Sequence, residues 1–220
     1  MKAKKQNANQ PGLRPIAALC VSGRSIYKHL PGVDPFDAKR GAQNFDAKKP
    51  AIAHPPCRCW SKYLSHCAKP VDAEAEMELG RWCVRTIQKC GGVVEQPAGS
   101  KLWADMGLPM PNERADSFGG WTAYVEQSWF SYKSRKPTWL YIVGVTKVEV
   151  PPVPFSLVKP APCQKPGLSS FGRSRTVTRF AVWLCQVARL ARVPDSAASA
   201  RGAQKAAPPG PLAKGDWKPF

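Results

Sequence analysis

The feature that most constrains the fold is a capped helix that stands between two short apolar segments. Residues 72–90 carry apolar side chains on one stripe, acidic side chains in the early turns and basic ones in the late turns, as an amphipathic helix requires. Asp72 stands at the N-cap position, and Gly91 follows the last turn. Apolar segments at 51–53 and 93–94 flank this helix. Strands that alternate with helices predict an α/β fold with parallel strand pairs.

Three further elements are expected outside this unit. Residues 16–21 predict a strand that ends in a turn at Ser22-Gly23, and residues 139–145 predict a strand because they are aromatic and β-branched. Residues 178–192 predict a last amphipathic helix. Residues 104–120, rich in Pro, Gly, Asp and Asn, predict a loop.

The ends of the chain have too little apolar content to form a core. We therefore expect one α/β domain over residues 13–192, a disordered basic tail at 1–12 and a disordered Ala/Pro/Lys-rich tail at 193–220.

The net charge points to a polyanionic partner. Lys and Arg number 33 against 15 Asp and Glu, a net charge of +18. No apolar run approaches the roughly 20 residues that span a bilayer, and no apolar stretch follows the basic start as in a secretory signal. DNA is the favoured partner, and no membrane association is expected. The alternative is that the excess charge only solubilises flexible ends.

The chain has eight cysteines, yet a secreted disulfide scaffold does not fit its length or its start. Cys83, Cys90 and Cys185 fall in helix-like segments, where cysteine usually behaves as a small apolar core residue. We expect reduced thiols and a cytoplasmic protein, in a bacterium or an infected host cell.

A thiol that follows two prolines is the first candidate for chemistry. Pro55 and Pro56 have restricted backbones and would aim the Cys57 sulfur, while Arg58 would favour the thiolate. A thiolate over a pyrimidine ring adds to C6 and makes C5 nucleophilic. Glu95, at the end of the adjacent expected strand, would donate a proton or hydrogen bond at N3.

These residues resemble the cytosine-C5 DNA methyltransferases. That family carries a Pro-Pro-Cys loop followed by an aromatic residue and Ser, then Glu-Asn-Val after one helix, then a Gln-x-Arg-x-Arg segment that runs into an apolar strand ending in Gly. The matching residues here are Pro55-Pro56-Cys57, Trp60-Ser61, Glu95-Gln96-Pro97, Gln127, Arg135-Lys136 and Leu140–Gly144. The chain also resembles small proteins encoded in phages and prophages.

The resemblance implies a fold, an activity and site residues. The fold would be a methyltransferase-like, Rossmann-type, mostly parallel sheet in truncated form. The activity would be S-adenosylmethionine-dependent methylation of cytosine C5 in DNA, with the base extruded from the stack. Cys57 would be the nucleophile, Glu95 the acid at N3, and Arg135 or Lys136 the cation that holds the base.

The same resemblance places the cofactor at Ser22, Gly23, Asp34 and Pro55, with Asp34 binding the ribose. The sequence departs from the family in three ways. The first loop keeps a single glycine, Gln96 replaces the family's Asn, and no target-recognition domain of normal size fits after Gly144.

Several alternatives stay open. Cys57 is a buried or incidental thiol in one of them, and Glu95 merely caps a turn in another. A zinc site is a third, from His54, Cys57, Cys59, His66 and Cys67. The runner-up function is a non-enzymatic nucleic-acid-binding phage accessory or counter-defence protein on a degenerate methyltransferase frame. Aromatic and basic side chains would then form a stacking and phosphate-binding edge, from Trp129, Phe130, Tyr132, Lys133, Arg135, Lys136 and, as a second phosphate contact, Arg173, Arg175 and Arg179.

Overall fold

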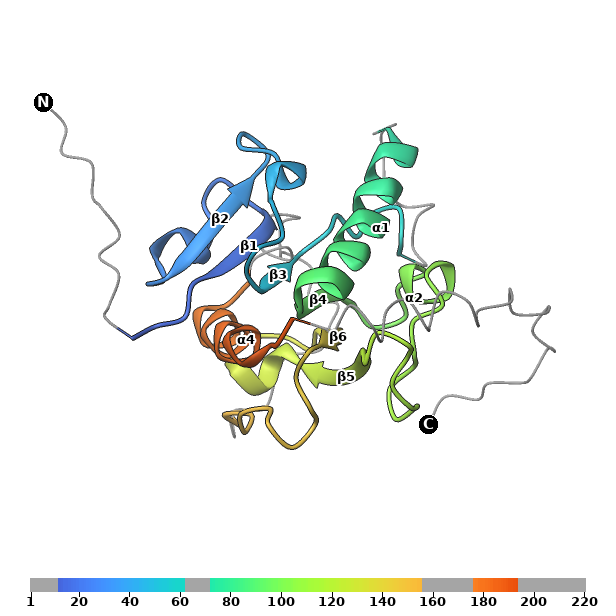
Figure 1. Ribbon diagram of the computed structural model, residues 1–220. Coiled ribbons are helices and arrows are strands. Elements are labelled where there is room, and N and C mark those ends of the chain that lie inside the picture. Colours follow the sequence, from blue (N-terminus) through green and yellow to red (C-terminus); the bar gives the residue numbers. More distant parts are fainter. Residues whose placement is uncertain (1–11, 62–71, 156–175, 194–220) are drawn as a thin grey trace, which may run out of the picture.

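The computed structural model describes residues 12–61, 72–155 and 176–193. Its centre is a six-stranded sheet with the strand order β2-β1-β3-β4-β6-β5 (Figure 1). The strands are β1 (Ile16–Val21), β2 (Val33–Asp37), β3 (Ala51–Ala53), β4 (Gly92–Pro97), β5 (Trp121–Glu126) and β6 (Pro137–Val143). The helices are α1 (Ala73–Cys90), α2 (Leu102–Asp105) and α4 (Thr178–Leu190), and three short 3₁₀ turns are η1 (Ile26–His29), η2 (Ala42–Asn44) and η4 (Gln127–Phe130).

The prediction of an α/β fold with a mostly parallel sheet is confirmed. Strands β2, β1, β3 and β4 run parallel to one another, whereas β6 runs antiparallel to both β4 and β5. Residues 127–136 join β5 to β6. This link is shorter than the crossover that two parallel neighbours need, so the pair is antiparallel.

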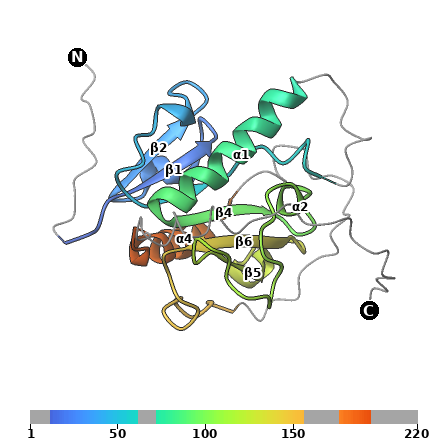
Figure 2. The ribbon, with the colours of Figure 1, turned by 45° about the vertical axis from the view of Figure 1, so that its right-hand side comes forward.

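Two layers of helix cover the sheet, one on each face (Figure 2). Alternate residues of each strand point to opposite faces, as the pleat requires. Ile16 and Ala18 of β1 join the core under α4, while Ala17 and Leu19 join the core under α1. Because both faces are buried, the central strands read as continuous apolar runs rather than as alternating ones.

Helix α1 has the ends that the sequence predicts. The Asp72 side chain accepts a hydrogen bond from the Ala75 N–H at 3.1 Å, which satisfies one of the free donors of the first turn. Gly91 ends the helix with its N–H bonded to the Ile87 carbonyl. Gly92 then enters β4 with φ +126°, and a Cβ there would overlap the Ala51 backbone of β3. Glycine is therefore required where α1 turns into the sheet.

The remaining elements differ from the sequence prediction in extent. Strand β2 continues through Pro35 to Asp37, α2 lies at the start of the expected loop, and α4 ends at Leu190 rather than at residue 192. Strand β5 was not predicted from the sequence. The expected tails, 1–12 and 193–220, lie almost entirely outside the described residues. Within those residues no helix has the length and apolar character needed to cross a bilayer.

Candidate functional site

The candidate site lies at the sheet edge where the parallel strands end. From β1 the chain goes to β2 on one side and then to β3 on the other, so the order of the strands reverses at β1. In open α/β sheets, ligands bind at such a reversal, outside the carboxyl ends of the strands. The turn at Ser22 leaves β1 there, the His54–Cys57 segment leaves β3, and Glu95 lies near the end of β4. Since β3 and β4 are parallel neighbours, Cys57, which follows β3, and Glu95, which lies two residues before the end of β4, both stand towards the carboxyl ends of these strands.

The loop that carries Cys57 is held by several hydrogen bonds. The Gln96 amide donates to the Pro55 carbonyl at 2.6 Å, and the Lys101 N–H donates to the Trp60 carbonyl at 2.9 Å. Within the loop the Trp60 N–H donates to the Cys57 carbonyl at 3.2 Å. Cys57 itself is exposed. The loop therefore presents its sulfur from a braced backbone.

Trp60 anchors this loop in the core on the α1 side. Its side chain is 1% exposed and packs against Gly80 of α1. A Cβ at position 80 would lie 2.5 Å from the Trp60 Nε1 atom. Glycine in the middle of a helix costs about 1 kcal/mol relative to alanine. Here it makes room for the indole ring.

A hydrogen-bonded chain of buried side chains surrounds Glu95. The Nδ1 atom of His54 lies 2.9 Å from Glu95 Oε2, and the Gln127 amide donates to Glu95 Oε1 at 3.0 Å. Gln127 also donates to the Thr138 hydroxyl at 3.1 Å. The other imidazole nitrogen, His54 Nε2, lies 3.0 Å from the Tyr27 hydroxyl. The Glu95 carboxylate of β4 is thus bonded to His54, which follows β3, and to Gln127 of η4. Tyr27 of η1 and Thr138 of β6 are linked to it through these two side chains.

The surroundings of Glu95 decide its charge. Burial by itself would raise the pKa of this carboxyl group, but the His54 hydrogen bond, the positive charge of Lys136 and the Gln127 hydrogen bond outweigh it and hold the pKa below its usual value. Glu95 is therefore a carboxylate at neutral pH. It needs a proton before it can act as the acid that the resemblance implies. Burial raises the pKa of Tyr27 well above the ordinary value, so Tyr27 keeps its hydroxyl proton.

The basic residues named from the sequence divide between two roles. Lys136 precedes β6, whose antiparallel direction brings its amino end to the site edge, and its charge acts on Glu95. Arg135 instead pairs with Glu126 at 3.1 Å and is 61% exposed. Arg58, expected beside the Cys57 thiol, pairs with Glu76 of α1.

On the cofactor side, the expected residues are only partly brought together. Ser22 and Gly23 form an exposed turn after β1, and a Cβ at Gly23 would meet no heavy atom within 4 Å. Pro55 lies buried in the neighbouring loop. Asp34 stands near the amino end of β2, opposite Ala17, so the structure does not bring it to this edge.

Asp37, and not Asp34, is the carboxylate at the carboxyl end of β2. Asp34 pairs with Arg40 and Lys49, and Asp37 pairs with Lys28. The sequence analysis named Asp34 and not Asp37, whereas β2 continues through Pro35 to Asp37. Proline is tolerated here since β2 is an edge strand.

The zinc alternative is not completed by the described residues. No group of three or more His, Cys, Asp or Glu side chains with metal-binding geometry occurs among them. Two of the candidate ligands, His66 and Cys67, lie outside the described residues. Cys83, Cys90 and Cys185 are buried in helices as expected. Burial raises the pKa of Cys90 and Cys185 to about 12, so both are neutral.

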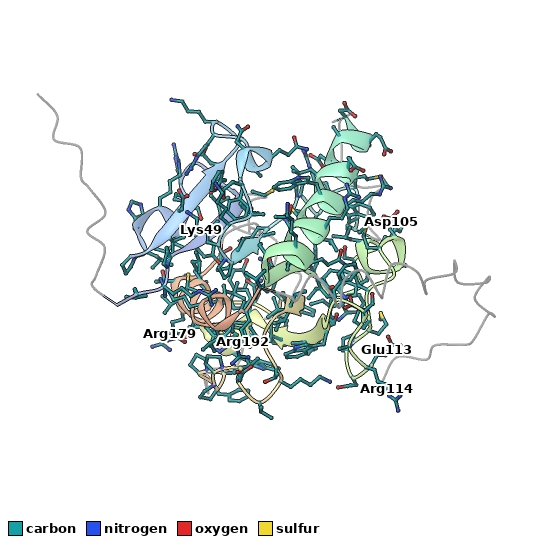
Figure 3. All side chains as sticks on the ribbon, in the orientation of Figure 1. Lys49, Asp105, Glu113, Arg114, Arg179 and Arg192 are labelled. Carbon is teal, nitrogen blue, oxygen red and sulfur yellow. The ribbon has the colours of Figure 1, made fainter. Side chains whose placement is uncertain are left out.

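The basic residues of the described part are spread over several elements. Lys49 stands before β3, Arg179 at the start of α4 and Arg192 beyond the end of α4 (Figure 3). The described residues hold 20 basic and 13 acidic side chains, a net charge of +7, so +11 of the total lies in the remaining sequence. This division of the charge supports the alternative that much of the net positive charge belongs to the ends of the chain.

An aromatic cluster lies at the β5 edge of the sheet. Tyr124, 42% exposed, and Phe155, 67% exposed, flank Trp129, with ring centroids 6.3 Å and 5.3 Å from that of Trp129. Phe130, also named from the sequence as a stacking residue, is instead fully buried against Phe180 of α4. Arg173 and Arg175 lie outside the described residues.

Sequence reasoning missed the partnership of His54, Tyr27 and Glu95. His54 was considered only as a metal ligand, and Tyr27 carries no local signal because it sits in a short polar turn. The one usable clue was that His54 directly follows a strand whose neighbour ends in Glu95. Comparisons with protein families, with curated proteins and with solved structures found no match for this chain.

Proposed function

We propose that this chain methylates cytosine C5 in DNA, with Cys57 as the nucleophile and S-adenosylmethionine as the methyl donor. The observation that carries the proposal is the placement of Cys57 and Glu95. Cys57 lies in the loop after β3, and Glu95 lies in β4, the parallel neighbour of β3, towards the carboxyl ends of the strands where α/β sheets bind ligands. A thiol on that loop and a carboxylate on the adjacent strand suit addition at C6 with assistance at N3.

The chain's own residues divide this work as follows. The braced Pro55-Pro56 backbone aims the exposed Cys57 sulfur, whose thiolate form attacks C6. Glu95, clamped by His54 and Gln127, faces the pyrimidine edge that carries N3. Lys136 supplies positive charge beside that carboxylate. The target base must leave the DNA stack to reach Glu95, whose side chain is 12% exposed.

Ser22, Gly23 and Asp37 stand at positions that suit the binding of S-adenosylmethionine. Ser22 and Gly23 leave open space at the strand-order reversal, and Asp37 stands where a carboxylate at the end of the second strand binds ribose hydroxyls in related folds. Asp37 takes the role first assigned to Asp34. When bound, S-adenosylmethionine supplies an electrophilic methyl group for C5.

The experiment is covalent trapping on DNA that contains 5-fluorocytosine, in the presence of S-adenosylmethionine. Fluorine cannot leave C5 as a proton does, so the sulfur–carbon bond at C6 persists and the adduct is seen by denaturing gel electrophoresis and mass spectrometry. Cys57→Ser should abolish the adduct. Cys59→Ser is the matched control, because that thiol lies two residues away and faces Glu76, and it should leave the adduct intact. No adduct with the wild-type chain would refute the proposal.

A second candidate function is nucleic-acid binding without catalysis, as in a phage accessory or counter-defence protein. The exposed Tyr124 and Phe155, which flank the half-buried Trp129, favour it, because aromatic faces stack on unpaired bases. Calorimetric titration with S-adenosylmethionine separates the two candidates, since the enzyme must bind it. Trp129→Ala should weaken binding to single-stranded DNA in both cases. DNA binding without cofactor binding would leave only this second function.

A further inference from the structure

The side chains of Tyr27, His54 and Glu95 form a hydrogen-bonded series. The addition step proposed above does not use His54. His54 lies between two buried partners, with side-chain exposures of 13% for His54 and 12% for Glu95, and Tyr27 fully buried. Both ring nitrogens are engaged, Nδ1 with Glu95 at 2.9 Å and Nε2 with Tyr27 at 3.0 Å. These two contacts fix the orientation of the His54 ring, which lies next to the carboxylate that needs a proton.

When a cytosine enters the site, a proton is needed between its N3 atom and Glu95. The N3 atom of cytosine and the Glu95 carboxylate are both acceptors, so they repel each other until one proton lies between them. Gln127, the other side chain bonded to Glu95, is an amide and cannot release a proton. Among the described residues bonded to Glu95, His54 alone can do so.

We propose that His54 is a positioning residue that clamps Glu95 and supplies it with the proton that Glu95 passes to N3 of the base. This inference rests on the proposed function. In the starting state His54 is an imidazolium whose two N–H groups donate to Glu95 and to the Tyr27 oxygen. The Nδ1 proton moves to Glu95, and His54 is left neutral with its Nε2–H still bonded to Tyr27.

The electrons balance in the addition step. The Cys57 thiolate pair forms the bond to C6, the C5–C6 π pair becomes the C4–C5 double bond, and the C4–N3 π pair takes the proton from Glu95. The negative charge of the thiolate and the positive charge of the imidazolium are both consumed. Glu95 ends as the carboxylate that it was at the start.

The groups that face this chain come from four elements of the described structure. They are Tyr27 of η1, Glu95 of β4, Lys136 before β6, whose charge acts on Glu95, and Cys185 of α4, which acts on Tyr27. Glu95 is thus the anionic partner of His54 at neutral pH. Tyr27 stays protonated and serves as a fixed neutral partner for Nε2.

The test compares His54→Asn with the wild type in the 5-fluorocytosine trapping assay. The Asn side-chain amide keeps an N–H near the position of Nδ1 and so preserves the hydrogen bond to Glu95, but it carries no transferable proton. We expect the adduct rate to fall about 10²-fold or more, the usual range for loss of acid assistance. His29→Asn, at an exposed position, is the control and should match the wild type.

A second arm does not depend on activity. The ring ¹⁵N resonances of the three histidines are recorded by NMR, and His54 is assigned by its absence in His54→Asn. Glu95→Gln should move the His54 resonances strongly, and Cys57→Ser should not. A His54→Asn variant that keeps the wild-type rate overturns the proposal, as do His54 resonances that do not respond to Glu95→Gln. If the wild type forms no adduct while the resonances respond, the hydrogen-bonded pair stands and both the proposed function and the proton-supply role fall.

Discussion

Replacement of Gln96 by leucine tests whether the Cys57 loop is braced from β4. Gln96 is 1% exposed, and its amide donates to the Pro55 carbonyl at 2.6 Å. Leucine has a similar size but no polar atoms, so the buried carbonyl loses this donor. An unsatisfied buried acceptor costs about 1–3 kcal/mol. The Ser100 hydroxyl, which donates to Gln96 Oε1 at 3.3 Å, also loses its acceptor, although it still accepts from the Leu102 N–H. We expect a loss of about 1–3 kcal/mol in unfolding free energy.

Urea denaturation and thiol labelling measure the two consequences. With a urea slope of about 1–3 kcal/mol per M, the midpoint should fall by about 1 M. Iodoacetamide labelling of the Cys57 peptide, followed by mass spectrometry, should become faster because the loop is loosened. Gln88→Leu is the matched control. Its amide, half-buried on α1, donates to Tyr141 at 3.3 Å, and Tyr141 keeps Asp116 as a partner, so the loss should stay near 0.5–1 kcal/mol. Equal losses in the two variants, with unchanged Cys57 labelling, would refute the bracing argument.

Two further predictions concern charge. The full chain should bind duplex DNA at low salt, with log affinity falling linearly against log salt as counterions are released; no binding at about 50 mM salt in a fluorescence-anisotropy titration would mean that the +18 charge serves solubility alone. The Arg192 hydrogen bond and the Thr146 backbone bond lower the pKa of Glu149 from 4.5 to about 2. Because the folded pKa lies below the unfolded one, this stabilisation is complete above about 4.5 and is lost as pH falls towards 2. Glu149→Gln should reduce that acid dependence in unfolding measurements, and an unchanged dependence would contradict the assignment.

Much of the secondary structure was predictable because its signals are local. Helix α1 has its cap, its apolar stripe and its terminal glycine within one stretch of sequence, and β1, β3 and β6 are short apolar runs. Strand β5 was missed because Gly119 and Gly120 precede it, and its own residues mix buried and exposed positions. The site loops were found for a local reason too, since the prolines and Cys57 are adjacent in the chain.

The contacts between those loops join residues that are far apart in the sequence. Strand order places β3 beside β4, and hence His54 beside Glu95, although 41 residues separate them. Antiparallel pairing brings Lys136 to the same edge, and the continuation of β2 through Pro35 places Asp37 rather than Asp34 at its end.

The sequence by itself determined the α/β class, the ends of α1 and the two residues, Cys57 and Glu95, on which the proposed function rests. Periodicity, capping and backbone restriction act over a few residues, so they can be recognised without knowing the partners. Only the tertiary structure decided which side chains share a hydrogen bond and what charge Glu95 carries. Those properties depend on burial and on distances between remote segments, and His54, Gln127 and Lys136 reach Glu95 only once the sheet has formed.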